Sequence, residues 1–254
     1  MTVKLSPRLL MSAEMVGDSK CVADVGCDRA HTCIWLLQNN RTERALGMDV
    51  RKGPLLKAEE NLELYECSDK VELRLSFGLD ELKPGEADTI IIAGMGGDMI
   101  RDILERDETA NRVLAQSSPT LILQPQTHSW NVRRWLDEHG YVIVAEDMVR
   151  DDDKFYPAMK AVRNEDQVLR GTKADGGDHS AAGLTDEELY FGPILLRTKH
   201  PVLREFLEIE YRKKQYMLTQ IKKSGTKEAE AKHEEVLDLF DIIRSACEIC
   251  GANI

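Results

Sequence analysis

No apolar stretch in the 254-residue sequence approaches the roughly 20 residues that a membrane-spanning helix requires. The segment from Met1 to Leu10 contains no apolar core followed by small residues, which a secretory signal would need. Cysteine is scarce, and the six cysteines show no dense, regular spacing, so free thiols are favoured over a disulfide framework. These absences predict a cytoplasmic protein without a membrane partner.

Only one cysteine pair, Cys247 and Cys250, has a spacing typical of a metal or redox site. A zinc site would need a second pair of ligands, and no such pair lies nearby in the sequence. We therefore expect two ordinary cysteines on a helix face and no bound metal.

Basic residues are outnumbered by acidic ones, 34 to 45, which leaves a formal net charge of −11. This balance argues against a protein that coats nucleic acid non-specifically, because such binding depends on neutralisation of phosphates by Lys and Arg. The balance reverses between Arg197 and Lys232, where ten Lys and Arg accompany five Glu. This segment is either a solvated helical face or a surface for a polyanion.

Short apolar segments alternate with helical segments over the first 165 residues, a pattern typical of βαβ units on a largely parallel sheet. We expect five such strands and then an antiparallel pair that closes one edge of the sheet. Helices are expected before the first strand and between later ones. The expected strands are 21–25, 45–50, 70–75, 89–93, 120–124, 141–146 and 155–162, and the expected helices are 5–16, 31–39, 54–65, 97–106 and 130–139.

The last third of the chain has a different character. Residues 165–185 are polar and glycine-rich, which predicts a linker or loop. Residues 186–254 carry apolar side chains at helical spacing, interrupted at 223–226, so two long helices joined by a short turn are the simplest interpretation. The sequence thus predicts a Rossmann-like α/β domain over 1–164, a linker over 165–185 and a coiled-coil-like helical hairpin over 186–254.

The first expected strand ends in an acid and a single-glycine turn, Asp24-Val25-Gly26-Cys27-Asp28. In open α/β sheets, ligands bind beyond the carboxyl ends of the strands, and glycine allows close approach of the backbone. A dinucleotide site would require Gly-x-Gly-x-x-Gly, of which only Gly26 is present. The turn therefore favours a cofactor without phosphates, such as S-adenosylmethionine, whose positively charged end Asp24 would hold. A simple strand-ending turn is the alternative.

Later strand ends supply further candidates. Asp49 ends the second strand at a position where a carboxylate can accept both hydroxyls of a ribose, although it could instead cap the next helix. Phe77 follows the third strand and would either wall in an adenine or pack in the core. The glycines of 94–97 imply close approach of the backbone to a cofactor, a substrate or another segment, or only a tight helix entry. Gln124 adds a polar group at the end of the fifth strand.

Several motifs together resemble the bacterial TrmK family of tRNA (adenine-22-N1)-methyltransferases. The matching motifs are Ser6-Pro7-Arg8-Leu9, Asp24-Val25-Gly26-Cys27-Asp28, Gly53-Pro54, Ala93-Gly94-Met95-Gly96-Gly97, Leu121-Ile122-Leu123-Gln124-Pro125, Arg134-Trp135-Leu136 and Lys154-Phe155-Tyr156. The resemblance covers about 5–162 and, through Phe191-Gly192-Pro193 and the hairpin, most of the remainder. It implies a class I methyltransferase fold, S-adenosylmethionine as methyl donor and N1 of an adenine in tRNA as acceptor.

The resemblance and the strand-end positions together identify candidate site residues. Asp28 is the candidate active-site acid, with a role as helix N-cap as the alternative. The candidate cofactor contacts are Arg8, Asp24, Gly26, Cys27, Asp49, Val50, Pro54, Phe77, Gly78, Gly94, Met95 and Gly96, and the candidate substrate contacts are Arg29, His31, Gln124, Lys213 and Lys214. The chain departs from the family pattern at Arg29, His31, Phe77, Gln126 and Pro157. A methyltransferase for another RNA or a small molecule, and a silent relative that binds RNA or a partner, are the alternatives.

Overall fold

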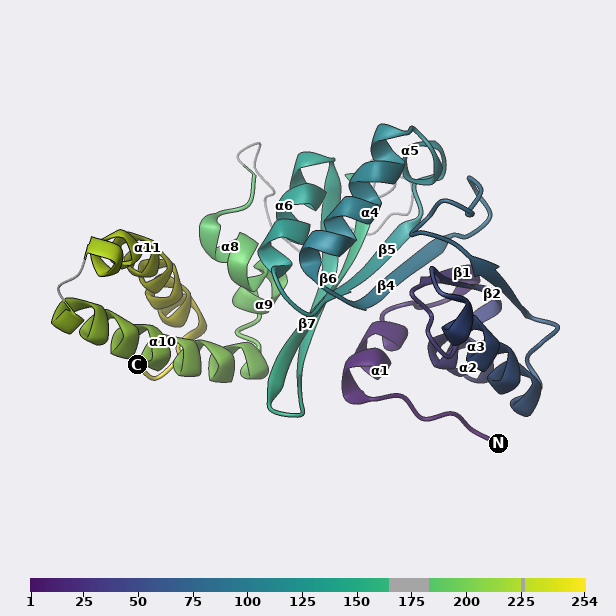
Figure 1. Ribbon diagram of the computed structural model, residues 1–254, viewed down its shortest axis with the longest axis horizontal. Coiled ribbons are helices and arrows are strands. Elements are labelled where there is room, and N and C mark those ends of the chain that lie inside the picture. Colours follow the sequence, from purple (N-terminus) through teal and green to yellow (C-terminus); the bar gives the residue numbers. More distant parts are fainter. Residues whose placement is uncertain (165–182, 225–226) are drawn as a thin grey trace. The chain divides into compact units, whose positions relative to one another are not determined.

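The computed structural model describes residues 1–164, 183–224 and 227–254 and divides the chain into two compact units, Met1–Ala181 and Ala182–Ile254 (Figure 1). Most of the predicted linker therefore lies outside the described residues, and the predicted domain boundaries stay predictions. No helix in the described ranges combines the length and apolarity needed to cross a membrane.

The first unit is built on a seven-stranded sheet in the order β3-β2-β1-β4-β5-β7-β6. Strands β1 to β5 are parallel to their neighbours, and β7 runs antiparallel to both β5 and β6. The strands are β1 (Ser19–Val25), β2 (Thr42–Asp49), β3 (Val71–Leu75), β4 (Thr89–Met95), β5 (Thr120–Pro125), β6 (Tyr141–Asp151) and β7 (Lys154–Arg163). The predicted sheet with an antiparallel pair at one edge is confirmed.

Six helices are described in this unit, and five of them were expected from the apolar periodicity. They are α1 (Pro7–Glu14), α2 (His31–Gln38), α3 (Lys52–Leu64), α4 (Gly97–Thr109), α5 (Val113–Ser117) and α6 (Ser129–Glu138). Figure 1 shows α4, α5 and α6 on the opposite side of the strands from α1. The unpredicted α5 has only five residues, too few to show a helical period.

Two helix boundaries illustrate how local sequence determines the fold. Pro7 is the first residue of α1, as its fixed φ favours, and the side chain of the N-cap Ser6 makes no capping hydrogen bond. Gly140 follows α6 with a φ of +70°, the left-handed conformation that commonly ends a helix.

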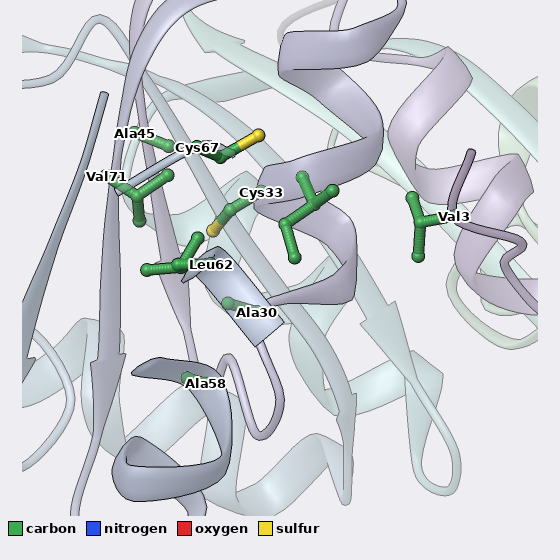
Figure 2. Close-up of a cluster of buried hydrophobic side chains, with 9 residues drawn as sticks. Val3, Ala30, Cys33, Ala45, Ala58, Leu62, Cys67 and Val71 are labelled. Atoms are coloured by element: carbon green, nitrogen blue, oxygen red, sulfur yellow. The ribbon is translucent and has the colours of Figure 1, made fainter. Parts of the chain in front are cut away.

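A buried cluster fixes the helices that lead into the carboxyl edge of the sheet (Figure 2). Ala30 and Cys33, at the start of α2, belong to this cluster together with Ala58 and Leu62 of α3 and Ala45 of β2. All five side chains are at most 3% exposed. Because this cluster holds the first turn of α2, it also positions the loop that precedes it.

Four helices are described in the second unit, α8 (Asp186–Phe191), α9 (Pro193–Arg197), α10 (Pro201–Ser224) and α11 (Lys227–Cys250). α10 and α11 pack together, with the rings of Tyr211 and Phe240 4.9 Å apart, so the predicted pair of long helices is confirmed. The short α8 and α9 were not expected; α8 begins with a capping box between Thr185 and Glu188.

Cys247 and Cys250 are buried, free cysteines on α11, in agreement with the helix-face interpretation. Within the described part of the chain, no group of three or more His, Cys, Asp or Glu side chains is arranged to hold a metal ion.

Candidate functional site

A cavity of about 490 Å³ opens at the carboxyl ends of β1 to β4 in the first unit. This volume lies within the range typical of small-molecule and cofactor sites. The ends of four strands and the loops after them supply most of the wall, and α1, α2 and α4 supply the rest. The lining residues are Arg8, Leu9, Asp24, Val25, Gly26, Cys27, Asp28, Arg29, His31, Thr32, Asp49, Val50, Arg51, Ser76, Phe77, Gly78, Ala93, Gly94, Met95, Met99 and Ile103.

The structure brings most of the predicted site residues into this one cavity. All the candidate cofactor contacts line it except Pro54, which lies in the first turn of α3, and Gly96, the N-cap of α4. Asp28, Arg29 and His31 line it as well. The remaining candidates lie elsewhere: Gln124 is buried behind the wall, and Lys213 and Lys214 belong to α10 of the second unit.

Sequence reasoning missed eight lining residues. All but two of them directly adjoin a residue that we did identify, so a wider window around each identified residue would have found them. Met99 and Ile103 differ, because they are four residues apart on α4 and their spacing signals only an apolar helix face. The missed residues are Leu9, Val25, Thr32, Arg51, Ser76, Ala93, Met99 and Ile103.

Asp24 is the most unusual ionisable group of the cavity. It ends β1, is 4% exposed, and has its pKa raised to about 7 because burial removes the carboxylate from water. The Sγ of Cys33 donates a hydrogen bond to its Oδ2 at 3.6 Å, which offsets part of this effect. Among the described residues, no cation lies beside this buried carboxylate, which is therefore suited to bind a positively charged ligand group.

Asp49 ends the neighbouring strand β2 and is 6% exposed. Its Oδ1 accepts a hydrogen bond from the backbone N–H of Arg51 at 2.9 Å, and the Arg51 side chain is 72% exposed. The N-cap of α3 is Arg51, so the alternative that Asp49 caps this helix is wrong. The carboxylate instead shapes the turn between β2 and α3 while lining the cavity.

The loop between β1 and α2 has an uncommon backbone. Gly26, Asp28 and Ala30 have φ angles of +81°, +48° and +57°, although two of them are not glycine. Left-handed backbone at non-glycine residues stores strain and is concentrated at functional sites. The N-cap of α2 is Ala30, so Asp28 does not cap the helix. Its carboxylate is 66% exposed and lies 3.9 Å from Nε of Arg29.

Gly26 supplies a test of how the loop shapes the cavity. A Cβ at this position would lie 2.3 Å from Cε of Met95, a lining residue that would have to move. We expect Gly26→Ala to weaken the binding of S-adenosylmethionine at least about fivefold, measured by calorimetry. The matched control is Gly85→Ala, because Gly85 has a φ of +72° but open space around it. Both variants should lose a similar stability of about 1–2 kcal/mol, and equal cofactor binding by the two would contradict the expectation.

Gln124 holds two parts of the site together. Its fully buried Oε1 accepts hydrogen bonds from N–H of Gly94 at 3.2 Å and from Nη1 of Arg8 at 3.4 Å. Its Nε2 donates to the carbonyl of Pro125. The guanidinium of Arg8 also lies 5.9 Å from the ring centroid of Tyr156. Gln124 thus positions Arg8 at the cavity wall.

The glycine-rich segment after β4 contacts another loop as well as the cavity. A Cβ on Gly97 would lie 2.4 Å from the carbonyl oxygen of His128 and 2.5 Å from that of Thr127. The N–H of Gly97 also donates to the Thr127 carbonyl at 2.8 Å. Of the interpretations left open for these glycines, close approach to another segment therefore applies to Gly97.

Phe77 is a wall of the cavity and not a core residue, since it is 44% exposed. The Arg106 guanidinium lies 5.1 Å from the centroid of its ring. Val50 and Met99 are also strongly exposed apolar residues of the lining. Together they form an apolar surface of the kind that a flat aromatic base covers.

His31 is held at the entrance to α2. Its Nε2 lies 3.2 Å from Nδ2 of Asn61, which also donates to the carbonyl of Arg29. Partial burial and the nearby Arg29 lower the pKa of His31. This shift favours the neutral imidazole, whose Nε2 can accept a hydrogen bond from the Asn61 amide.

Comparisons with known proteins agree over nearly the whole chain. A family of methyltransferase domains matches residues 5–159. The tRNA (adenine(22)-N(1))-methyltransferase of Bacillus subtilis is 30% identical over 247 residues, which cover 97% of this chain and 98% of that protein. The crystal structure of the B. subtilis M1A22 tRNA methyltransferase TrmK superposes with a TM-score of 0.80 and 27% identity, covering 96% and 99% of the two chains. A putative tRNA (m1A22) methyltransferase of Streptococcus pneumoniae, in complex with S-adenosyl-L-methionine, superposes with a TM-score of 0.78, 27% identity and the same coverage.

Proposed function

Because the chain belongs to the TrmK family of methyltransferases, we propose that it transfers the methyl group of S-adenosylmethionine to N1 of adenine 22 in tRNA. The observation that carries this proposal is the cavity itself. It joins two buried acids, at the ends of β1 and β2, to an apolar wall on the same edge of the sheet. That combination suits a ligand with a cationic end, a ribose and a purine.

The lining residues divide among the parts of the cofactor. We propose that Asp24 holds its amino group, Asp49 accepts the ribose hydroxyls, and Phe77 with Val50 covers the adenine. Arg8, held by Gln124, would bind the carboxylate of the amino acid end. When bound, S-adenosylmethionine supplies an electrophilic methyl group; the protein supplies position and charge.

The acceptor step needs little help from proton transfer. Adenine N1 has a lone pair available, so holding the base in line with the methyl group supplies most of the acceleration. We propose that the exposed carboxylate of Asp28 accepts a hydrogen bond from the exocyclic amine. It would also stabilise the positive charge that develops on the methylated base.

The function is tested with the full-length protein in two assays. Calorimetry should show binding of S-adenosylmethionine, and a tRNA transcript with adenine at position 22 should gain 1-methyladenosine, detected by mass spectrometry of its nucleosides. The same transcript with guanine at position 22 is the control. Cofactor binding without methylation of tRNA would favour another acceptor, whereas no cofactor binding would favour the silent relative.

The exposed face of α10 is proposed as a second contact with tRNA. Arg212, Tyr216 and Lys223 are exposed at positions i, i+4 and i+11, and Tyr216 is 66% exposed. Lys213 is also exposed and lies 2.8 Å from Glu210 through its Nζ, while Lys214 is half-buried. Cations beside an aromatic ring suit both phosphates and unstacked bases.

We expect the double variant Arg212→Ala/Lys223→Ala to bind tRNA about tenfold more weakly in moderate salt. Each lost phosphate contact should reduce the slope of log affinity against log salt by about 1. Filter binding at several salt concentrations measures both quantities. The control Lys20→Ala/Lys70→Ala removes the same charge from exposed positions at the start of β1 and just before β3, so equal losses in the two variants would mean a general charge effect.

We also propose that the protein acts in the cytoplasm. All six cysteines are free thiols in the structure, in keeping with a reducing compartment, and the proposed substrate is a tRNA. Fractionation of cells that carry a tagged copy tests the location.

A further inference from the structure

The loop between β5 and α6 borders the cavity and is tied to its wall. The N–H of Gln126 donates to the carbonyl of Met95, a lining residue, at 2.8 Å. The N–H of Gly97 donates to the carbonyl of Thr127, also at 2.8 Å. Side chains that follow this loop therefore lie at the same carboxyl edge of the sheet as the cavity.

The backbone of this loop is held in a conformation that is unfavourable by itself. His128 has a φ of +50°, the left-handed region, although it is not a glycine. Asp98 accepts a hydrogen bond from Nδ1 of His128 at 2.6 Å and another from Nδ2 of Asn131 at 2.7 Å. Asn131 is buried, so this pair of bonds anchors the exposed His128 to α4. The loop is thus preorganised.

The first residues of α6, directly after this loop, present an aromatic ring together with a cation. Trp130 is partly exposed, and the guanidinium of Arg134, one helical turn later, lies 5.0 Å from the centroid of its rings. The ring of His128 lies 6.3 Å from that of Trp130, tilted by 49°. Proteins that bind single-stranded nucleic acid stack its bases on aromatic rings, and an arginine beside the ring can contact a phosphate.

The charge around the cavity favours RNA as the occupant. The chain has a net charge of −11, yet the loops at this edge expose Arg29 and Arg51, with side chains 63% and 72% exposed beside Asp28 and Asp49. Arg134 is exposed as well. The acid nearest to His128, Asp98, is already engaged by two hydrogen bonds. Phosphates can therefore approach this edge despite the acidic chain.

We infer that Trp130, Arg134 and His128 form a stacking platform for a tRNA nucleotide that flanks the target adenine. The inference rests on the proposed function, because it places the platform beside the acceptor and assigns it a share of substrate recognition. The base stacks on Trp130, and Arg134 contacts the adjoining phosphate. His128, fixed by Asp98, limits where that base can lie.

Intrinsic fluorescence provides a direct test, because the chain contains only three tryptophans. Trp135 is 3% exposed, and Trp35 packs against the core clusters, whereas Trp130 follows the loop that is bonded to the cavity wall, so we expect tRNA to quench Trp130. Titration of the full-length protein with tRNA should quench the emission, and the quenching should disappear in Trp130→Phe. Equal quenching in wild type and Trp130→Phe would overturn the inference.

Kinetics provide the second test. Trp130→Ala and Arg134→Ala should each lower kcat/KM for tRNA about tenfold, with the affinity for S-adenosylmethionine unchanged. Arg134 is exposed, so its variant tests the platform even if Trp130→Ala folds poorly. Lys20→Ala is the control for the loss of one charge. Unchanged kcat/KM for tRNA in the Arg134 variant, together with unchanged tRNA affinity, would overturn the platform and leave a protein partner as the occupant of this surface.

Different results would contradict tRNA methylation and the stacking platform. If wild-type protein binds S-adenosylmethionine and quenches with tRNA but methylates nothing, the proposed function fails and the platform stands. If it methylates tRNA with Trp130 and Arg134 both dispensable, the platform fails and the proposed function stands.

Discussion

An Asp24→Asn variant is expected to bind S-adenosylmethionine at least about 10²-fold more weakly than the wild type, and yet to unfold at a higher temperature at pH 8. Both effects come from one buried carboxylate whose pKa is raised to about 7. Without ligand, the ionised Asp24 is poorly solvated and opposes folding. With ligand, the same charge meets the amino group of the cofactor.

The pH dependence follows from the sign of this shift. Between the pKa of the unfolded chain, about 4, and the folded value near 7, the native state holds a proton that the unfolded state has lost, so raising the pH lowers stability. Above pH 7 the loss is complete and amounts to at most about 4 kcal/mol. Asparagine does not titrate, so the stability of the Asp24→Asn variant should lack this loss between about pH 4 and 7.

Cofactor affinity should show the opposite trend. Between pH 6 and about 7.5, where the amino group of the ligand keeps its proton, affinity for the wild type should rise with pH as Asp24 ionises. Calorimetry and thermal unfolding over this range measure the two trends. Asp18→Asn, an exposed acid ahead of β1, is the control. A variant that is both less stable and normal in cofactor binding would contradict the role of Asp24.

The second large effect concerns turnover. Asp28→Asn is expected to lower kcat for tRNA methylation about 10²-fold with unchanged affinity for S-adenosylmethionine, because it removes a charge that stabilises the cationic product. Asparagine is the informative substitution here. It tolerates the left-handed φ of +48°, whereas alanine would add backbone strain to the loss of charge.

Single-turnover measurements with saturating cofactor and tRNA isolate this step. The carboxylate is exposed and its nearest cation, Nε of Arg29, is 3.9 Å away, so the protein should fold normally. Arg29→Gln serves as the companion variant: it removes the partner of Asp28 and should change kcat far less. Full turnover by Asp28→Asn would make a catalytic role for this acid untenable.

The chain is most predictable where neighbouring residues decide the outcome. Ile90, Ile91 and Ile92 form a continuous β-branched stretch, which predicts a central strand, and all three are fully buried in β4. Asp24 and Asp49 were found because a parallel sheet brings the ends of its strands to one edge. Short helices such as α5 escape this reasoning, because five residues carry no period.

Contacts between segments that are distant in the chain could not be predicted from the sequence. Gln124 was expected to face the substrate, but it is buried and binds Arg8, which lies 116 residues away in the chain. For the glycines of 94–97, the sequence left close approach to a ligand or to another segment open. In the fold, a side chain on Gly97 would meet the carbonyls of Thr127 and His128.

The sequence by itself therefore determined the class of fold, the edge of the sheet that carries the site and most of the residues lining the cavity. These follow from local periodicity and from the position of polar residues after strands. Only the tertiary structure decided that Asp24 is desolvated, that Asp28 is exposed and free of a capping role, and that the Arg134 guanidinium lies over the ring of Trp130. Burial and the contacts across loops arise only when the chain has folded, and they set the charge, strain and reach of each side chain.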